Sequence, residues 1–534
     1  MRHAPTPVRR SSIVLILNML FLSLAGSWVI PQVRGEQARG VVFHDKDGDG
    51  RRQPGEPGLP GIKVSNGEQI VATNRAGEYE VTVSDDSIVF VIKPSGWRTP
   101  ISDDQLPQFF YIHKPKGSPP AKFAGVKPTG PLPKSIDFPL YPQREPAKFR
   151  AILFGDPQPR NQKELDYIAH DVVQELVGVK AAFGVTLGDI VFDDLSLLKP
   201  QAQTIALLGI PWYNVIGNHD INTDAADDAG SDETFEQVFG PSYYSFDYGT
   251  THFLVLDDIE WIVPEGAEKG SYRGGFGKRQ IEFIRNDLAS IPKNQLVVLL
   301  MHVPFTDVND RQEVYRLIEQ RPFCVSVSGH THYHEHRYIT KADGWQGPEP
   351  HHHIINVTVS GSWWAGIPDE RGIPHTLMRD GAPNGYSIIS FDGSKYDLEF
   401  RASGRPADYQ MQIHAPDAVA AAAAGETTIY ANVFNGSSRS KVEIQVGESP
   451  WRAMQHSAEP DPGFVKVVAA EKAIEKPTWR ALPAVVPSSH LWKLNLPAKL
   501  PVGVHLIRVR ATDEKGKAVN GARVIRVVPD TASP

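Results

Sequence analysis

The chain has 534 residues, which is too long for a single hydrophobic core and indicates two to four domains. Hydrophobic residues make up 41% and charged residues 22%, as is typical of globular proteins. The net charge of -7 disfavours binding to the phosphate backbone of a nucleic acid. The single cysteine, Cys324, excludes an intrachain disulfide.

Residues 1–35 have the pattern of a secretory signal peptide. Three arginines precede an apolar run at 12–30, and the small residues Ala25 and Ser27 offer a cleavage point. We therefore predict a periplasmic or secreted protein with no stable membrane span after cleavage. The alternative is an uncleaved N-terminal anchor, because the apolar run is nearly long enough to cross a bilayer.

Short alternating apolar segments with Gly, Pro and Asn turns predict a small β-sandwich over residues 38–100. Inside it, one loop matches the calcium pattern D-x-D-x-D-G-x5-E at Asp45, Asp47, Asp49, Gly50 and Glu56. The carboxylates can surround one calcium ion in a structural role; the alternative is a solvated acidic turn. This stretch resembles the SdrD B-like repeats of bacterial surface proteins, whose loops bind calcium.

Three further regions follow along the chain. Residues 101–147 are rich in proline and predict an extended linker that packs along the next domain. Residues 148–405 alternate apolar strands with helical patterns, which predicts a layered α/β domain. After a linker or short helix at 415–425, short strands predict an immunoglobulin-like β-sandwich over 426–530, without obvious chemistry.

In the central region, five apolar strands each end in polar side chains. Such residues gather beyond the carboxyl ends of the strands in open α/β sheets, where ligands bind. The metal-ligand candidates are Asp156, Gln158, Asp189, Asn218, His302, His330 and His332. Seven donors exceed the needs of one ion, so two divalent ions that share one carboxylate fit better.

The motifs GDPQ, GD, GNHD, MH and GHTH occur in this order between residues 149 and 400. In this respect the chain resembles the calcineurin-like metallophosphoesterases, in particular a bacterial subgroup with N- and C-terminal β domains. The resemblance implies a central four-layer α/β/β/α sandwich flanked by two small β-sandwich domains. It also implies a metal-dependent phosphoric ester hydrolase that acts on a phosphate monoester or diester by attack of a metal-bound hydroxide.

The resemblance also assigns a role to each motif residue. Asp156, Gln158, Asp189 and His332 would hold the first metal, and Asp189, Asn218, His302 and His330 the second, with Asp189 as the bridge. His219 would be the general acid that protonates the leaving group, and Asp220 would orient it.

One position departs from the family pattern. The family usually has a histidine two residues after the first aspartate, where this chain has Gln158. Two divalent ions (Mn, Fe or Zn) are expected, and the glutamine favours the harder ions manganese and iron over zinc. The substitution is also expected to weaken the first metal site.

Trp363, Trp364, Asn384 and Tyr386 are candidate substrate-binding residues because they follow the last metal motif closely. The alternative for the tryptophans is packing in the core or between domains. The tract His351–His353 is expected to be an exposed loop rather than a third metal site.

The sequence does not separate a small-molecule, lipid-linked or phosphoprotein substrate. The alternatives to a small-molecule phosphoesterase are a protein phosphatase and a catalytically silent surface binding protein. The intact set of metal-ligand candidates favours an enzyme.

Overall fold

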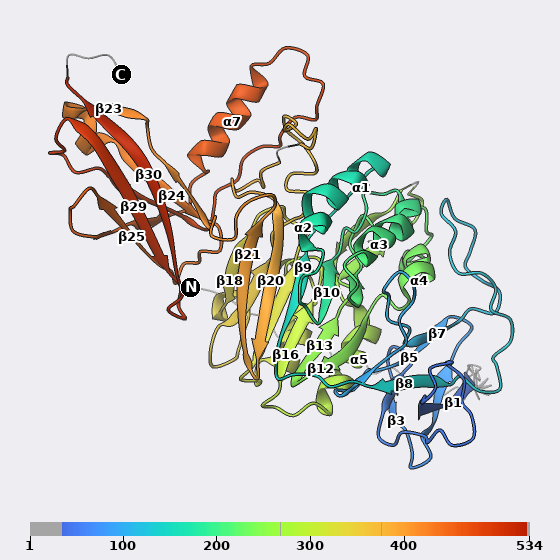
Figure 1. The fold of residues 1–534 in the computed structure, drawn as a ribbon. Helices are drawn as coiled ribbons and strands as arrows, with labels where there is room; N and C mark the ends of the chain where they lie inside the picture. Colours follow the sequence, from blue (N-terminus) through green and yellow to red (C-terminus); the bar gives the residue numbers. More distant parts are fainter. Residues whose placement is uncertain (1–34, 268, 375, 531–534) are drawn as a thin grey trace, which may run out of the picture. The chain divides into compact units, whose positions relative to one another are not determined.

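The computed structural model describes residues 35–267, 269–374 and 376–530 (Figure 1). The predicted signal peptide therefore lies outside the described residues, except for Gly35. Of the described residues, 36–530 belong to one compact unit. In the described ranges, no helix combines the length and the hydropathy that crossing a membrane requires.

Two mixed sheets form the centre of the region from residue 148 to 405. The first has the order β11-β10-β9-β20-β21 and contains β9 (Lys148–Phe154), β10 (Phe183–Leu187), β11 (Trp212–Val215), β20 (Gly385–Asp392) and β21 (Lys395–Ala402). The second has the order β12-β13-β16-β17-β19-β18 and contains β12 (Tyr244–Tyr248), β13 (Thr251–Val255), β16 (Leu296–Leu300), β17 (Cys324–Ser328), β18 (Glu335–Ile339) and β19 (His351–Ile355). Strands β9, β10 and β11 are parallel, as are β13, β16, β17 and β19.

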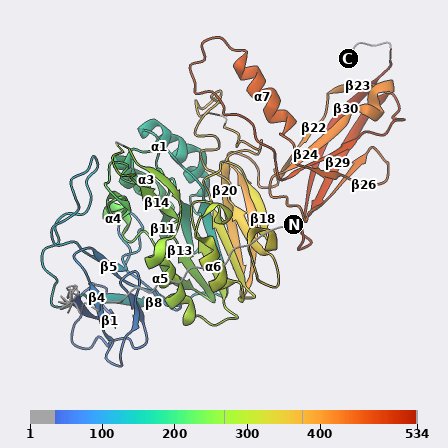
Figure 2. The same cartoon turned by 180° about the vertical axis from the view of Figure 1, so that it is seen from behind.

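Helices cover the outer faces of the two sheets (Figures 1 and 2). They are α1 (Gln162–Ile168), α2 (Gln174–Leu176), α3 (Leu198–Ala206), α4 (Glu233–Phe239), α5 (Gly277–Ala289) and α6 (Arg311–Ile318). The central strands are buried on both faces; all five residues of β16 (LVVLL) are buried. This arrangement is the predicted four-layer α/β/β/α sandwich. A small hairpin of β14 (Ile259–Ile262) and β15 (Ser271–Gly274) lies outside the two sheets.

The predicted helical faces are the buried ones. Leu165 and Ile168 of α1 are buried, and Val172 and Leu176 continue the same face through a π-helical turn at 169–173 into α2. The Asn161 side chain accepts a hydrogen bond from the backbone of Glu164 and so begins α1.

Two four-stranded sheets form the N-terminal β region. Their orders are β4-β1-β8-β6 and β3-β2-β5-β7, and the strands are β1 (Glu36–His44), β2 (Lys63–Ser65), β3 (Ile70–Ala72), β4 (Glu78–Val83), β5 (Ser87–Val91), β6 (Trp97–Arg98), β7 (Phe110–His113) and β8 (Phe138–Pro142). The prediction of a linker at 101–147 is wrong where β7 and β8 lie. β8 pairs in parallel with β1, and β7 pairs with β5, because the edge backbone groups of those strands need partners.

Two more sheets form the C-terminal β region. They contain β22 (Met411–His414), β23 (Ala418–Ala420), β24 (Thr428–Val433), β25 (Lys441–Val446), β26 (Arg452–Ala453), β27 (Gln455–Ser457), β28 (Leu491–Asn495), β29 (Gly503–Thr512) and β30 (Ala518–Val528). The segment expected to be a linker or short helix at 415–425 contains β23, which pairs with β30, followed by a 3-10 helix from Ala421 to Glu426. Helix α7 (Pro462–Lys472) interrupts the region between β27 and β28.

The His351–His353 tract is strand β19, so the prediction of an exposed loop is wrong. The side chains of His351 and His353 are buried and both hydrogen-bond to the Ser326 hydroxyl. His352 points the other way, as strand alternation requires, and its Nε2 lies 2.9 Å from Nδ1 of His336. Asn435 of the C-terminal region contacts His336 through its Oδ1, at 2.9 Å.

The buried pair of His336 and His352 leads us to expect that acid destabilises the fold. Burial lowers the pKa of His336 and His352, so both rings are neutral in the folded chain. Unfolded histidine titrates near pH ~6.5, so the unfolded chain binds more protons below that pH. We expect the thermal unfolding midpoint to fall as the pH drops from about 6.5 to 5. Each ring contributes up to about 1.4 kcal/mol per pH unit in this window.

The double variant His336→Gln/His352→Gln checks this expectation in thermal unfolding scans at several pH values. Its unfolding midpoint should depend less on pH than that of the unmodified protein. His170→Gln, at an exposed helical position, is the matched control. Equal pH dependence in the double variant and the unmodified protein would contradict the assignment.

Candidate metal centre

The seven predicted metal ligands lie at one edge of the two sheets. Asp156 and Gln158 follow β9, Asp189 follows β10, Asn218 follows β11, His302 follows β16, and His330 and His332 follow β17. All five strands end at this edge because they run parallel within their sheets. All seven side chains belong to one site, linked by the contacts described below.

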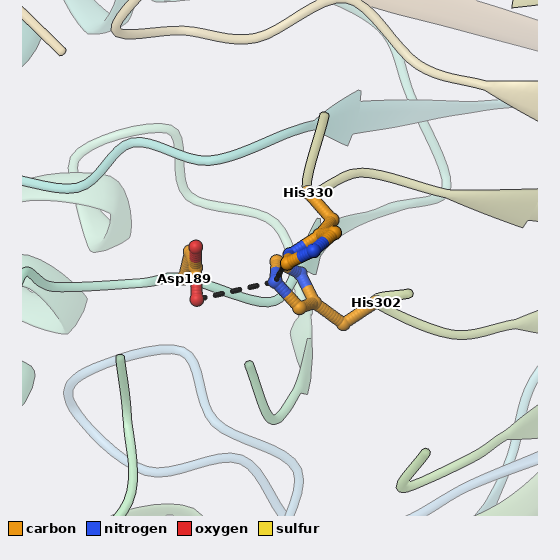
Figure 3. A group of neighbouring side chains, drawn as sticks. All are labelled: Asp189, His302 and His330. Atoms are coloured by element: carbon orange, nitrogen blue, oxygen red, sulfur yellow. Dashed lines mark hydrogen bonds and ion pairs between the residues drawn. The ribbon is translucent and has the colours of Figure 1, made fainter. Parts of the chain in front are cut away.

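The predicted ligands of the second metal converge on the ring of His302, and Figure 3 shows Asp189 and His330 beside that ring. Its Nε2 lies 3.2 Å from Asp189 Oδ1 and 3.1 Å from both Asn218 Oδ1 and His330 Nδ1. Asp189, His302 and His330 each offer one ligand atom within 4.8 Å of the others. Four donors around one point fit a divalent cation.

The predicted ligands of the first metal surround the other side of Asp189. Gln158 Nε2 donates to Asp189 Oδ2 at 2.6 Å, and His332 Nε2 lies 3.8 Å from Asp156 Oδ1. Gln158 Oε1 and His332 Nε2 are buried and have no hydrogen-bond partner among the described residues. Buried polar atoms without partners are costly, so these two atoms fit a site that binds a cation.

The backbone is strained at five of the seven positions. Positive φ angles occur at Asp156 (42°), Gln158 (42°), Asp189 (49°), His330 (77°) and His332 (56°). A non-glycine residue in this conformation costs about 1–3 kcal/mol, and such strain is typical of functional sites. The strain supports a role for these residues in binding rather than in packing.

Backbone carbonyls fix the tautomers of two histidines. His302 Nδ1 lies 2.8 Å from the carbonyl oxygen of Leu187, and His332 Nδ1 lies 2.5 Å from that of Gly361. A carbonyl only accepts hydrogen bonds, so each Nδ1 carries the proton. Nε2 of both rings therefore faces the site, and it offers a lone pair for metal ligation when the ring is neutral.

The electrostatics of the site favour positive charge. Burial disfavours the charged form of His302, but Asp189 and Asp156 outweigh it and raise the pKa of His302 to about 10. Burial lowers the pKa of His332 to about 3, so this ring is neutral and able to ligate. The carboxylates thus stabilise a cation where the rings meet, which agrees with the chemistry of the donor set.

His219 lies beside the ligand cluster and contacts a residue that the motifs do not include. Its Nδ1 lies 2.6 Å from Oδ1 of Asp193, and its ring stacks on Phe192 with centroids 4.3 Å apart. Burial lowers the pKa of His219, but Asp189 and Asp193 outweigh it and raise the pKa to about 9. Bound cations would oppose this shift.

The prediction that Asp220 orients His219 is wrong. The buried Asp220 carboxylate accepts hydrogen bonds from the backbone amides of Ile190, Val191 and Gly217. It therefore ties the loop after β10 to the loop after β11, and Asp193 takes the place beside the ring. The acidic pair after the GD motif, in GDIVFDD, is the sequence signal that could have indicated Asp193.

The Asp193 contact predicts a loss of activity without loss of metal. We expect Asp193→Asn to lower kcat on the order of tenfold, because His219 loses the partner that fixes its ring. The loss should be larger for an alkyl phosphate than for 4-nitrophenyl phosphate. Asp194→Asn is the matched control, because Asp194 caps only the following turn. Unchanged kcat on the alkyl ester would contradict the role of Asp193.

The predicted substrate-binding residues separate into two groups. Trp363 lies at the site, with its ring 4.0 Å from that of His332 between centroids. The prediction is wrong for the other three, which are buried and have structural partners. Trp364 donates to the carbonyl oxygen of Pro157, Asn384 donates to Asp171, and Tyr386 packs against Phe154.

Tyr272 of β15 also lies at the site, although the sequence does not indicate it. Its ring centroid lies 6.1 Å from that of His330, and 40% of the residue is exposed. Trp363 and Tyr272 thus place two aromatic surfaces next to ligands of the two predicted metal positions. No motif in the sequence marks Tyr272, because it lies outside the strands that carry the ligands.

Three segments match family profiles that share one description. Residues 149–334 match the calcineurin-like phosphoesterases, residues 46–127 match the N terminal of calcineurin-like phosphoesterase, and residues 352–518 match its C terminal. The chain belongs to the calcineurin-like phosphoesterases. It is therefore a metal-dependent hydrolase of phosphoric esters, and the family implies a dinuclear metal centre. The seven predicted ligands fit such a centre.

Two solved structures resemble this phosphoesterase. The purple acid phosphatase PPD1 from yellow lupin (Lupinus luteus) seeds shares 14% identity over 69% of this chain and 72% of that chain, with a TM-score of 0.36. CopC from Methylosinus trichosporium OB3b shares 16% identity over 23% of this chain and 95% of that chain, with a TM-score of 0.14. At these scores neither similarity bears on function. No curated protein matches the chain.

Gln158 predicts a weak first metal site in this phosphoesterase. Its Nε2 donates to Asp189, so only the neutral oxygen Oε1 is free to ligate. We expect Gln158→His to bind the first metal more tightly, because imidazole is a stronger ligand than an amide for these ions. Metal titration by calorimetry of both proteins measures this difference. Identical binding isotherms would contradict the prediction, and Gln162→His, at an exposed position of α1, is the control.

Proposed function

We propose that the protein is an exported dimetal phosphoesterase that hydrolyses a phosphate monoester or diester. The observation that supports the proposal is the position of His219 beside the seven converging ligand candidates. Its backbone amide donates to Asp189 Oδ1 at 3.0 Å, so the ring is held next to the predicted bridging carboxylate. When bound, two divalent ions supply an activated water and neutralise charge on the phosphoryl oxygens.

The chain itself contributes positioning and proton transfer. Asp156, Gln158, Asp189 and His332 would hold the first ion, and Asp189, Asn218, His302 and His330 the second. His219 donates a proton to the leaving-group oxygen, which contributes roughly 10²–10⁴-fold. We infer that manganese or iron suits the first site better than zinc, because Gln158 is a hard oxygen ligand.

A substrate panel tests the proposal. The purified protein is loaded with manganese and assayed on aryl and alkyl phosphate monoesters, bis(4-nitrophenyl) phosphate, nucleotides and phosphopeptides. We expect turnover of at least one class, and the pattern separates a monoesterase from a diesterase or a protein phosphatase. No turnover of any member, with two metals verified by elemental analysis, would favour a silent binding protein.

We further propose that the loop from Asp45 to Glu56 binds one calcium ion in a structural role. Asp45, Asp47 and Asp49 each offer an oxygen within 4.8 Å of the others. Gly50 has a φ of 74°, as the sharp turn requires. Calcium should raise the thermal unfolding midpoint of the unmodified protein. It should leave the midpoint of the Asp49→Ala variant unchanged. An equal shift in both proteins would place the calcium elsewhere.

Export is supported by the arginines and the apolar run of residues 1–35. Expression with and without this segment tests it. The full chain should reach the periplasm or the medium in processed form, and the shortened chain should stay in the cytoplasm. Retention of the full chain in the cytoplasm would contradict export.

A further inference from the structure

The chain around α7 packs on the phosphoesterase domain beside the metal centre. Phe464, Val468 and Leu482 form a buried apolar cluster with Ala365. The backbone amide of Gly366 donates to the carbonyl oxygen of Arg480 at 2.8 Å. These contacts fix the backbone of Arg480 close to the loop that carries Trp363.

A second link strengthens this attachment. The buried carboxylate of Glu471 accepts hydrogen bonds from the amides of Ile367, at 2.8 Å, and Leu482. Glu471 therefore joins the loop that carries Trp363 to the irregular segment between α7 and β28. Because Leu482 is only two residues beyond Arg480, the position of Arg480 is held from both sides.

The side chain of Arg480 reaches the residue on which the general acid stacks. Its guanidinium carbon lies 5.9 Å from the ring centre of Phe192, and the Phe192 ring stacks on His219. The guanidinium of Arg160 lies 4.9 Å from the same ring centre. Two cations thus lie on the His219 side of the metal centre.

The two arginines differ in their partners. The guanidinium of Arg160 already has hydrogen-bond partners, with Nη1 2.7 Å from Glu164 Oε1 and Nη2 2.7 Å from the carbonyl oxygen of Trp363. Arg480 is exposed and forms no ion pair within the described ranges of the chain. It is therefore free to pair with an anion that arrives from solvent.

The position of His219 determines which part of a substrate Arg480 meets. A general acid that protonates the leaving oxygen faces the leaving group. Arg480 lies farther out on the same side, at the ring of Phe192, so it can meet the part of the leaving group that lies away from the scissile bond. Guanidinium pairs with carboxylate or phosphate through two parallel hydrogen bonds, which makes it a selective reader of such groups. An uncharged leaving group would gain nothing from this contact.

We propose that Arg480 is a specificity-determining residue that selects phosphate esters whose leaving group carries a second negative charge. This inference rests on the proposed function of the metal centre. The substrate class is a phosphate ester of an anionic alcohol or phenol, with a carboxylate or a further phosphate on the part of the leaving group that lies away from the scissile bond. The C-terminal region thereby contributes a side chain to the substrate-binding site.

A matched pair of esters tests the proposal. 4-Carboxyphenyl phosphate carries the additional charge, and 4-carbamoylphenyl phosphate has nearly the same size without it. The ratio of their kcat/KM values is measured in the unmodified protein and in Arg480→Ala. Comparing the ratios cancels the intrinsic difference in leaving-group reactivity.

We expect the ratio of kcat/KM for the carboxyl ester to that for the carbamoyl ester to fall on the order of fivefold in Arg480→Ala. A loss of this size is expected when a partly exposed charge pair is removed. Raising the salt concentration should lower the ratio in the unmodified protein and not in the variant. Arg480→Lys should retain part of the preference for the carboxyl ester. If Arg480→Ala fails to fold, Arg480→Gln takes its place in the comparison. Arg452→Ala, at an exposed position on β26, should leave the ratio unchanged.

The outcomes separate the two hypotheses. If the unmodified protein hydrolyses both esters and the ratio is the same in Arg480→Ala and Arg480→Gln, the role of Arg480 is wrong and the phosphoesterase stands. If it hydrolyses neither ester nor any other member of the panel, the proposed function is wrong and the role of Arg480 falls with it. Competition by 4-hydroxybenzoate, the anionic product, should also weaken in Arg480→Ala.

Discussion

Replacing His219 by alanine should lower kcat/KM on an alkyl phosphate on the order of 10²–10⁴-fold. An alkoxide is a poor leaving group, so its departure needs the proton that His219 donates. 4-Nitrophenolate leaves without protonation, and the loss on 4-nitrophenyl phosphate should be much smaller. The ring lies next to Asp189 and is held by Asp193 and Phe192, so it is positioned for this transfer.

The measurement is a plot of log(kcat/KM) against the pKa of the leaving alcohol for both proteins. The slope should be steeper in His219→Ala, which a merely structural defect would not produce. His170→Ala, at an exposed helical position, should leave the slope unchanged. Full activity of His219→Ala on the alkyl ester would exclude the role of general acid.

Asp189→Asn should remove most of the activity, on the order of 10³-fold or more. Asp189 Oδ2 contacts Gln158 and Asp189 Oδ1 contacts His302, so this carboxylate joins the two predicted ligand groups. An amide has the same shape but no negative charge, and it can offer only one oxygen. The variant should therefore bind at least one metal ion less tightly.

Elemental analysis and calorimetric titration of the variant measure this loss directly. Asp392→Asn is a suitable control, since Asp392 is paired with Lys148 at the protein surface. Two tightly bound ions in Asp189→Asn would show that Asp189 does not bridge. Normal activity would exclude both the bridge and the assigned centre.

The sequence determined the chemistry of the site because the ligands are local to strand ends. Asp156, Asp189 and His302 each directly follow a buried apolar run, and such runs predict parallel strands whose carboxyl ends meet. Asn218 and His330 also follow apolar runs and were predicted at the same edge for the same reason. All five side chains are drawn together by the fold, as predicted, and Gln158 was recognised as the departure from the family pattern.

The sequence also determined the layered core. Apolar runs of five residues predict buried strands, and the spacing of Leu165 and Ile168 predicts the buried face of α1. The flanking β regions were predicted from short alternating segments and turn residues. Their edges were not, because a strand such as β7 or β8 is recognised by the neighbour with which it pairs rather than by its own pattern.

Only the tertiary structure decided what lies around the metal ligands. Asp220 and Asp193 are both acidic residues near motifs, and only the backbone amides around Asp220 show that its charge is used structurally. Trp363 and Trp364 are adjacent in sequence, yet one lies against His332 and the other is buried. Arg480 is almost 300 residues from Phe192, and no periodic pattern connects residues that meet through the packing of separate regions. Ligand type and order are local properties of the sequence, whereas the partners that orient a proton donor and read a substrate depend on long-range contacts.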